Sequence, residues 1–477
     1  MYPDISLHID GSWTKASGGK TIPVLNPASG EPIGAVPQAE IADLERAAQA
    51  AEKGFRVWRK VSAFERYGVL RKAATNLRSR VEDIARTMTL EQGKPVTEAK
   101  LETLNAADVI DWFAEEGRRA YGWIIPARFE GFHQLAVKEP VGPVAAFTPW
   151  NFPINQAVRK VSGALAAGCS IVLKGAEDTP ASVAEFVRCF VDAGLPPGVI
   201  NLVYGIPSEI SEYLVPHPII RKISFTGSTT VGKHLASLAG KHMKRLTMEL
   251  GGHAPGIVFE DADLDQAVKV LATGKFRNAG QVCIAPTRLL VHEPLYERFV
   301  ERFTATAKAL KVGDGLDPQT KMGPLVSGRR VDAMEGFVSD AKAKGATVRT
   351  GGNRIGNKGF FFEPTVLTDV PMEARMMNEE PFGPVAMIAP FKDFDSAVSE
   401  ANRLPYGLAA YAFTKSAKTA AAIGSAIESG MVAINNAALA LPELPFGGVK
   451  DSGYGTEGGA EALEGYLNTK YIAQVGV

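Results

Sequence analysis

Cysteine is scarce in this sequence, and the histidines form no pattern that binds metal. The chain has 477 residues but three cysteines, an odd number that indicates no disulfide framework and fits a reducing compartment. Its seven histidines include no His-Glu-x-x-His motif, and there is no Cys-x-x-Cys motif. Because zinc sites depend on such spacings, we expect no metal site in this chain.

The sequence also lacks a net charge and a long apolar run. Its 52 basic residues balance its 52 acidic residues, which argues against nucleic acid or an anionic membrane as a main partner. The longest apolar run, Ala164 to Leu173, is too short to cross a bilayer. Residues 1–13 show no basic region ahead of an apolar run, as a secretory signal has. We therefore expect a cytoplasmic protein without a membrane or nucleic-acid partner.

Strands and helices alternate from Val144 to about Val270. The expected strands are 144–147, 171–174, 200–203, 223–225 and 254–259, with helices over 155–167, 180–193, 208–214 and 229–238. Such alternation predicts a parallel, doubly wound sheet, whose ligands bind at the carboxyl ends of its strands.

Other segments surround this expected sheet. Apolar residues at helical spacing predict earlier helices, which are expected over 41–58, 64–90 and 96–119. A second α/β pattern covers about 265–450, and residues 133–140 and 466–475 have the patterns of strands. The fold class expected from both patterns is α/β.

Cys283 is the residue around which we expect the chemistry to be organised. A nucleophilic thiol must be partly exposed, held on a bent backbone and placed in a positive field that favours the thiolate. Gly280 can bend the backbone, and Lys275 and Arg277 can supply positive charge. The alternative is that Cys283 packs as a small hydrophobic residue, as most free cysteines do.

Residues 227–234 almost match the phosphate-binding P-loop motif, with the sequence Gly-Ser-Thr-Thr-Val-Gly-Lys-His. That motif requires Ser or Thr after the lysine, because the hydroxyl binds magnesium, but His234 occupies the position. We instead interpret Gly227 and Ser228 as a turn into a helix whose N-terminus binds the pyrophosphate of a dinucleotide. The alternative is an ordinary turn, since the usual Gly-x-Gly-x-x-Gly pattern is absent.

Two pairs of polar residues complete the candidate site. Lys174 and Glu177 follow an expected strand, where a carboxylate can bind ribose hydroxyls and repel a 2′-phosphate. Asn151 lies in a rigid turn beside Trp150 and can donate to a developing oxyanion. Glu249 lies among apolar neighbours that would raise its pKa, as a general base needs. The alternatives are a solvated ion pair, a turn asparagine and a solvent-facing strand residue.

A series of short motifs resembles the aldehyde dehydrogenase superfamily over nearly the whole chain. In order, they are Pro149-Trp150-Asn151-Phe152-Pro153, Lys174 with Glu177, Phe225-Thr226-Gly227-Ser228, Glu249-Leu250-Gly251-Gly252, Gly280-Gln281-Val282-Cys283, Glu380-Pro381-Phe382-Gly383-Pro384 and Pro445-Phe446-Gly447-Gly448. The resemblance implies that Cys283 is the nucleophile, Glu249 the base, and Asn151 part of an oxyanion hole with the Cys283 amide. It also implies a set of residues that bind the cofactor, namely Trp150, Lys174, Glu177, Gly227, Ser228, Glu380 and Phe382.

The same resemblance implies an aldehyde dehydrogenase-like fold with three parts. They are a Rossmann-type NAD-binding domain over 1–118 and 140–251, a catalytic domain over 252–461, and oligomerisation strands over 119–139 and 462–477. The implied assembly is a homodimer or a homotetramer.

The implied reaction is oxidation of an aldehyde to its acid through a thiohemiacetal and a thioester on Cys283. NAD is expected rather than NADP because of Glu177, although Lys174 weakens this preference. Relatives that act on succinic semialdehyde carry arginines at the positions of Arg159 and Arg277, which implies a semialdehyde bearing a carboxylate, such as that of succinate or 2-oxoglutarate. The loop 438–444 lacks the serine of those relatives, so the clamp for the carboxylate is incomplete by that comparison.

Other readings of the sequence remain at this point. The chain can be a general aliphatic or aromatic aldehyde dehydrogenase, a relative that transfers its thioester to coenzyme A, or a catalytically silent structural relative. The presence of Glu249 argues against the coenzyme A reaction, and the presence of both Cys283 and Glu249 argues against a silent protein.

Overall fold

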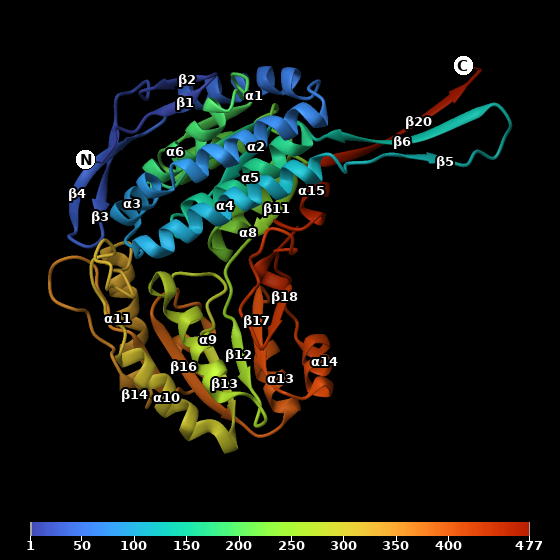
Figure 1. Cartoon of the computed structure of the whole chain (residues 1–477). Helices are drawn as coiled ribbons and strands as arrows, with labels where there is room; N and C mark the ends of the chain where they lie inside the picture. The colour runs from blue at the N-terminus through green and yellow to red at the C-terminus, as the bar shows by residue number, and fades with distance from the viewer. Residues whose placement is uncertain (1, 477) are drawn as a thin grey trace.

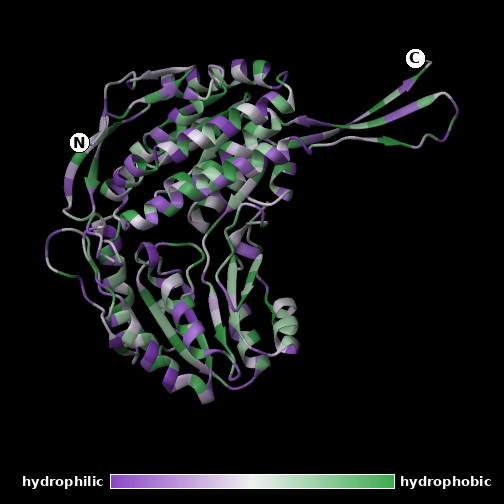
Figure 2. Ribbon diagram, in the orientation of Figure 1, coloured by the Kyte–Doolittle hydropathy of each residue, from purple (hydrophilic) through white to green (hydrophobic). Residues whose placement is uncertain are grey.

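Two large sheets, one above the other in Figure 1, and a small sheet that projects from the upper one organise the chain. This arrangement comes from a computed structural model that describes residues 2–476. Figure 2 shows the strands of the lower sheet as mainly hydrophobic and the outer helices as a mixture of hydrophobic and hydrophilic residues, and the strands β7 to β10 of the upper sheet are buried throughout. That contrast is typical of parallel sheets covered on both faces by helices.

The first sheet has eight strands in the order β19-β11-β10-β7-β8-β9-β1-β2. Its strands are β1 (Leu7–Ile9), β2 (Ser12–Thr14), β7 (Val144–Phe147), β8 (Ile171–Lys174), β9 (Ile200–Val203), β10 (Lys222–Thr226), β11 (Arg245–Glu249) and β19 (Gly453–Tyr454). The central run from β11 to β9 is parallel, which confirms the prediction for 144–147, 171–174, 200–203 and 223–225, while β1 and β19 pair antiparallel on either side. The placement of 254–259 in the same sheet is wrong, because β12 (Pro255–Val258) pairs within the second sheet, and β11 was not expected. Chain order reverses between β7 and β10, and this switch point is where parallel sheets bind ligands.

Helices that precede or connect these strands cover the first sheet. They are α1 (Ile41–Trp58), α2 (Ala63–Ser79), α3 (Val81–Gln92), α4 (Val96–Gly117), α5 (Pro153–Ala167), α6 (Pro180–Asp192), α7 (Pro207–Leu214) and α8 (Thr229–Lys241). The single helix predicted over 64–90 is wrong, because the chain leaves helical geometry at Arg80 (φ −106°, ψ 11°) between α2 and α3. The helix α5 begins with proline in its first turn and ends at Gly168 with φ 94°, two standard helix boundaries.

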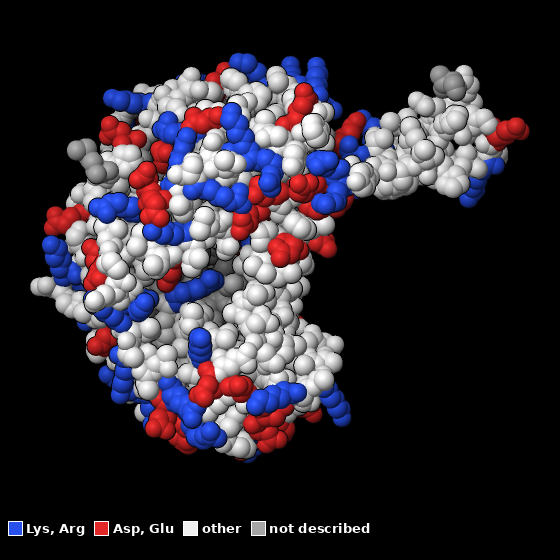
Figure 3. All heavy atoms as spheres, in the orientation of Figure 1, with Lys and Arg blue, Asp and Glu red and all other residues white. Residues whose placement is uncertain are grey.

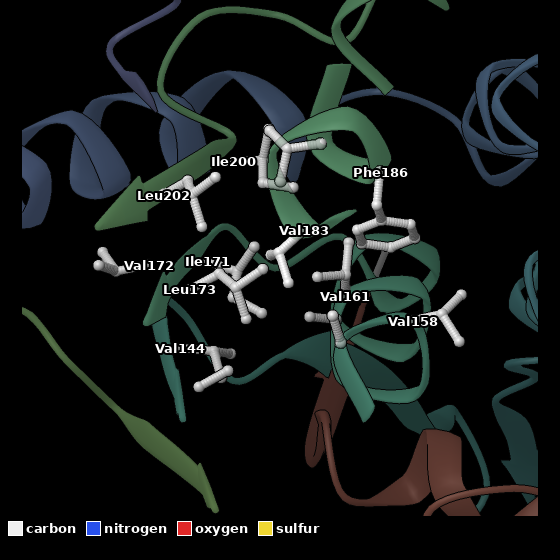
Figure 4. Packing of buried hydrophobic residues seen from close by; sticks show 14 of the residues in the cluster. Val144, Val158, Val161, Ile171, Val172, Leu173, Val183, Phe186, Ile200 and Leu202 are labelled. Carbon is white, nitrogen blue, oxygen red and sulfur yellow. The ribbon is translucent and has the colours of Figure 1, made fainter. Parts of the chain in front are cut away.

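Packing between α5, α6 and the parallel strands forms the core of the first sheet (Figure 4). Val161 of α5 lies on the side of the helix that faces Val144 of β7 and Ile171 of β8, and all three are fully buried. Burial of each such side chain stabilises the fold by about 1.5–3 kcal/mol. The strand ends that carry the candidate site residues therefore extend from a rigid support.

The second sheet has the order β14-β15-β16-β13-β12-β17-β18, and only β14 is antiparallel to its neighbour. Its strands are β12 (Pro255–Val258), β13 (Arg288–His292), β14 (Thr347–Thr350), β15 (Thr365–Thr368), β16 (Val385–Phe391), β17 (Ala409–Phe413) and β18 (Met431–Ile434). Its helices are α9 (Leu264–Phe276), α10 (Tyr296–Lys308), α11 (Gly328–Ala343), α12 (Arg375–Asn378), α13 (Phe394–Asn402) and α14 (Ala417–Ala426). It has its own core, separate from that of the first sheet.

The projecting sheet pairs the last strand with a hairpin from the middle of the chain (Figure 1). It consists of β5 (Trp123–Ile125), β6 (Phe132–Pro140) and β20 (Leu467–Val475), and the short helix α15 (Glu461–Glu464) precedes β20. A separate hairpin joins β3 (Thr21–Asn26) to β4 (Glu31–Pro37). The three predicted domains stay a prediction, and β19 pairs with the first sheet although it lies in the range predicted as catalytic.

Figure 3 shows basic and acidic side chains interspersed over the visible face, without a large area of one sign. Among the helices of residues 2–476, none combines the length and the apolar character needed to cross a membrane. The same part of the chain contains no cluster of three or more His, Cys, Asp or Glu residues that could hold a metal ion.

Candidate active site

A cavity of about 390 Å³ lies where the carboxyl ends of the first sheet meet loops of the second sheet. The first sheet contributes residues that follow β7, β10 and β11, and the second contributes loops that precede β13 and β16. Eight of the predicted site residues line this cavity, namely Trp150, Asn151, Gly227, Ser228, Glu249, Cys283, Glu380 and Phe382. Residues from five separate motifs therefore meet in one place.

A second cavity of about 660 Å³ continues from the first along the same strand ends. The two share Trp150, Gly227 and Ser228, and the second extends to Lys174 and Glu177 at the end of β8. Together they cross the switch point between β7 and β10, where an extended two-part ligand such as a dinucleotide fits.

The N-terminus of α8 suits a phosphate group. Ser228 occupies the position before the helix in extended geometry, but its side chain makes no capping hydrogen bond, so the first backbone N–H groups remain available. A side chain at Gly227 would approach the ring of Phe225 to 2.5 Å, so this position requires glycine. The residues present here fit the pyrophosphate predicted from the sequence.

The loop that carries Cys283 turns sharply. Asn278, Ala279 and Gly280 all have left-handed backbone geometry, with φ values of 47°, 51° and 70°. A side chain on Gly280 would lie 2.1 Å from the carbonyl oxygen of Gly383, so only glycine allows this close approach. The buried Gln281 fixes the loop, because its Nε2 donates to the Asn278 carbonyl at 3.0 Å and its Oε1 accepts from the Val326 N–H at 3.0 Å.

The electrostatic environment of Cys283 differs from the expectation. The thiol is half-buried, but burial raises its pKa to about 12, with further increases from the Glu380 and Glu249 carboxylates. Arg277 lowers this pKa, as predicted, but Lys275 points elsewhere, since its buried Nζ donates to the Thr287 hydroxyl at 3.2 Å. The expectation that two cations favour the thiolate is wrong, and the thiol needs a proton acceptor.

Asn151 is buried and its side chain is held in place. Its Nδ2 donates to the Gln281 carbonyl at 3.0 Å, which leaves the second hydrogen of the amide for another acceptor. Its backbone carbonyl accepts from Lys94 Nζ at 2.8 Å and from Asn278 Nδ2 at 2.9 Å. The turn predicted after β7 is thus tied to the Cys283 loop, and the amide faces the cavity that Cys283 lines.

Glu249 is a buried carboxylate without hydrogen-bond partners. It ends β11 with 2% of its surface exposed, and neither of its oxygens has a partner within residues 2–476. Burial raises its pKa well above the ordinary value, the Glu457 carboxylate raises it further, and Lys160 and Arg159 oppose both. A carboxylate in this state holds a proton readily, as predicted for a general base, and the alternative of a solvent-facing residue is wrong.

A buried ion pair that the sequence did not reveal lies next to Glu249. Lys160 of α5 pairs with Glu457, and its Nζ also donates to the Thr226 hydroxyl at 2.7 Å. The Ser224 hydroxyl donates to the same Glu457 carboxylate at 2.9 Å. Lys160 lies in a largely apolar helix, α5, and Glu457 lies in a glycine-rich segment. Neither residue therefore stands out in the sequence.

Two further residues hold the loops together and were also missed. Lys94 is fully buried, pairs with Glu102 and lies 4.0 Å from the centre of the Phe152 ring. Asn278 joins the Cys283 loop to the Asn151 turn and accepts from Gln92 Nε2 at 2.8 Å. The signal that could have indicated them is a lysine and an asparagine in otherwise apolar or turn segments close to the predicted site.

The remaining predicted cofactor residues occupy the two ends of the joined cavities. Lys174 forms an ion pair with Glu177, which partly neutralises the carboxylate expected to repel a 2′-phosphate. At the other end, Glu380 accepts from the Gly252 N–H at 3.2 Å, and burial raises its pKa to about 7. Phe382 packs edge-on against Trp150, with ring centres 5.7 Å apart.

The two predicted substrate arginines have different surroundings. Arg159 is buried, stacks on the Phe446 ring at 4.9 Å, and donates to the carbonyls of Ala440, at 2.8 Å, and Glu457. Arg277 is half-buried and lies 5.5 Å from the centre of the Phe152 ring. Within residues 2–476 it makes no salt bridge, unlike Lys94 and Lys160. Its guanidinium is therefore the more available of the two for an anionic ligand.

Comparison with known proteins gives a consistent family. The sequence profile described as the aldehyde dehydrogenase family matches residues 13–472. A 4-(hydroxymethyl)benzenesulfonate dehydrogenase of Comamonas testosteroni is 49% identical over 100% of this chain and 99% of its own length. A succinate-semialdehyde dehydrogenase (NADP+) of Escherichia coli is 43% identical over 97% of this chain and 96% of its own length. The structure of an aldehyde dehydrogenase from Bacillus cereus in complex with NAD+ has a TM-score of 0.97 at 36% identity, and covers 100% of this chain and 97% of that one.

Proposed function

Because the chain belongs to the aldehyde dehydrogenase family and therefore carries out NAD(P)-dependent oxidation of an aldehyde, we propose that it acts on aldehydes with an anionic group at the far end. We propose Cys283 as the nucleophile, Asn151 as an oxyanion donor and Glu249 as the general base. The observation that carries this proposal is that all three line one cavity, which continues into a groove suited to a dinucleotide.

The reaction begins at the Cys283 sulfur. Sγ forms a bond to the aldehyde carbon, the carbonyl oxygen becomes an oxyanion, and the free N–H of the Asn151 amide together with the Cys283 backbone N–H stabilises it. The thiol proton needs an acceptor, because the thiol pKa is raised to about 12. Glu249, with its raised pKa and unpartnered oxygens, is suited to accept it.

The second half of the reaction hydrolyses a thioester. A nicotinamide cofactor bound in the joined cavities would supply the hydride acceptor, so that loss of hydride from the aldehyde carbon would leave an acyl group on Cys283. Once the first proton has passed from Glu249 to solvent, the Glu249 carboxylate removes a proton from water, whose oxygen attacks the acyl carbon while Asn151 again donates to the oxyanion. The bond from carbon to sulfur breaks, and the carboxylic acid leaves. Division of the oxidation into two steps lowers each barrier.

Cofactor binding uses the joined cavities. The residues proposed to hold it are Lys174 and Glu177 at the adenine ribose, Gly227 and Ser228 at the pyrophosphate, and Trp150, Glu380 and Phe382 at the nicotinamide half. We propose NAD as the preferred cofactor, because Glu177 adds negative charge where NADP carries its 2′-phosphate. The Lys174–Glu177 ion pair limits this preference, and the similar proteins include an NADP+-dependent enzyme and an enzyme solved in complex with NAD+.

The substrate is proposed from the arginines. Arg277 offers an unpaired guanidinium close enough to Cys283 to lower its pKa, and a guanidinium binds a carboxylate in a two-point geometry. Arg159 shapes the same region, although two of its N–H groups are used by the Ala440 and Glu457 carbonyls. A semialdehyde bearing a carboxylate, such as succinic or 2-oxoglutaric semialdehyde, is therefore the first candidate.

A sulfonated aldehyde is the second candidate. A sulfonate binds guanidinium groups as a carboxylate does, and the similarity to a 4-(hydroxymethyl)benzenesulfonate dehydrogenase supports it. Steady-state assays of succinic semialdehyde, 2-oxoglutaric semialdehyde, 4-formylbenzenesulfonate, butanal and benzaldehyde with NAD and with NADP test the proposal. The anionic aldehydes should have the larger kcat/KM values, and equal values for butanal and succinic semialdehyde would contradict it.

The projecting sheet is proposed to join copies of this chain. Trp123 and Ile124 of β5 are 52% and 79% exposed, and Tyr471 of β20 is 56% exposed, which leaves apolar surface on an isolated protomer. We propose a homodimer or a homotetramer built through this sheet, and a cytoplasmic location stays a prediction. Light scattering coupled to gel filtration measures the assembly, and a monomer at micromolar concentration would contradict it.

A further inference from the structure

A cavity of about 290 Å³ along one face of α9 holds two basic side chains, Lys269 and Arg277. Val270, Ile284 and Tyr411 supply an apolar lining between them. Ile284 directly follows Cys283 in the chain, so the inner part of this cavity lies close to the proposed nucleophile. The cavity shares no lining residue with the groove proposed for the cofactor, and it lies beside the loop that carries the thiol.

The geometry of α9 sets the order of the two cations. Lys269, Thr273 and Arg277 recur at every fourth residue, a spacing that places side chains on one face of a helix. A helix rises by about 1.5 Å per residue, so Lys269 begins about 12 Å along the axis from Arg277. Arg277 lies at the end of α9 that leads into the Cys283 loop, which makes it the inner cation and Lys269 the outer one.

Both cations lack an acidic partner. No acidic residue lines the cavity, and within residues 2–476 neither Lys269 nor Arg277 forms a salt bridge. Lys269 is exposed, in contrast to Lys275 on the same helix, which is buried and bonded to Thr287. The Glu98 carboxylate lies near enough to Arg277 for their charges to interact, but it does not line the cavity, so the two cations around this apolar space suit an anion that carries an apolar group.

The apolar wall between the cations is fixed in position. The Tyr411 hydroxyl donates to the Ile284 carbonyl at 2.7 Å, which holds the tyrosine ring against the residue that follows Cys283. A flat ring of a ligand can pack on the Tyr411 ring and the Ile284 side chain. An anion attached to the far side of such a ring would lie beyond Arg277, in the direction of Lys269.

We propose that Lys269 is a further specificity-determining residue, which binds the anion of aldehydes whose carbonyl and anionic group are separated by an aromatic or similarly long apolar spacer. Short semialdehydes reach Arg277 alone, whereas longer ones reach both cations. This inference rests on the proposed function, because it assumes that the aldehyde approaches Cys283 through this cavity.

The test compares matched anionic and neutral aldehydes. The aryl pair is 4-formylbenzenesulfonate and benzaldehyde, the short pair is succinic semialdehyde and butanal, and each ratio is kcat/KM for the anionic member divided by that for the neutral one. Lys269→Met should lower the aryl ratio by about two- to fivefold, as expected for an exposed ion pair, and leave the short ratio unchanged. Lys308→Met, an exposed lysine of α10 outside the cavity, should change neither ratio.

A second measurement separates this inference from the proposed function. 4-Toluenesulfonate, which has no aldehyde, should protect Cys283 from alkylation by iodoacetamide, and its half-protecting concentration should rise about two- to fivefold in Lys269→Met. High salt should abolish that difference, because exposed charges are screened. If the unmodified protein oxidises none of the aldehydes, the proposed function fails, yet the protection assay still decides the role of Lys269. Equal protection in both proteins, or an equal fall in the aryl and short ratios, would overturn the inference.

Discussion

Replacement of Glu249 by glutamine should make the protein more stable while it stops turnover. Glu249 is buried, both of its oxygens lack partners within residues 2–476, and the nearby Glu457 carboxylate repels its charge. A buried polar group without partners costs about 1–3 kcal/mol, and more when it is charged. Glutamine keeps the shape and removes the charge, so we expect a gain of about 1–3 kcal/mol in the free energy of unfolding at pH 8.

The pH dependence gives the sign of this effect. The pKa of Glu249 in the folded protein lies above its ordinary value of 4.5, so the folded state binds the proton more tightly than the unfolded state. The stability that this proton supplies is fully present below pH 4.5 and is lost as the pH rises through the raised pKa. The advantage of Glu249→Gln over the unmodified protein should therefore grow with pH.

Urea unfolding at several pH values measures the difference. Glu335→Gln is the matched control, because Glu335 is exposed on α11 and outside the cavity. In the same Glu249→Gln protein, steady-state turnover should disappear and the first burst of NADH should be slower, because Glu249 is proposed to accept the thiol proton as well as the proton of water. A variant that is less stable at high pH than the unmodified protein would refute the reasoning about the unpartnered carboxylate.

Three other substitutions give separate tests. Asn151→Ala should lower kcat about 10²- to 10³-fold with cofactor affinity retained, because one oxyanion donor is lost, and an unchanged kcat would count against that role. Glu457→Gln should move the acid limb of the pH–kcat profile to lower pH, since it removes a charge that raises the pKa of Glu249, and a shift to higher pH would contradict this. Glu177→Gln should reduce the ratio of kcat/KM for NAD to that for NADP, and an unchanged ratio would remove Glu177 from cofactor choice.

The parallel strands of the first sheet could be predicted from the sequence, because the spacing of apolar residues changes clearly between the strands and the helices. Unbroken apolar runs such as Val144–Phe147 can form only buried strands when helices of matching length separate them, and β7 to β10 follow that rule. The antiparallel additions β1 and β19 could not be predicted in this way. They are two or three residues long, and their partners are fixed by tertiary contacts rather than by local pattern.

The sequence predicted which residues form the site, but it did not predict the burial and the charges that surround them. The motifs identified Cys283, Glu249 and Asn151, and all three line one cavity. The direction in which a side chain points depends on its angular position around the helix axis. At the end of α9, this position places Lys275 in the core and leaves Arg277 near the thiol. The rule that ligands bind at the carboxyl ends of parallel strands describes the first sheet alone, because Cys283 lies in a loop that precedes β13 of the second sheet.

The central claim is that the acyl group of the substrate is carried by the Cys283 sulfur. Unmodified protein mixed with NAD and a turned-over aldehyde is quenched in acid during the first turnovers, digested and measured by mass spectrometry. The account predicts an acyl mass on the peptide that contains Cys283, and no such mass on the peptides of Cys169 and Cys189, which are buried. NADH formation with no acyl adduct at Cys283, or with the adduct on another residue, would contradict it.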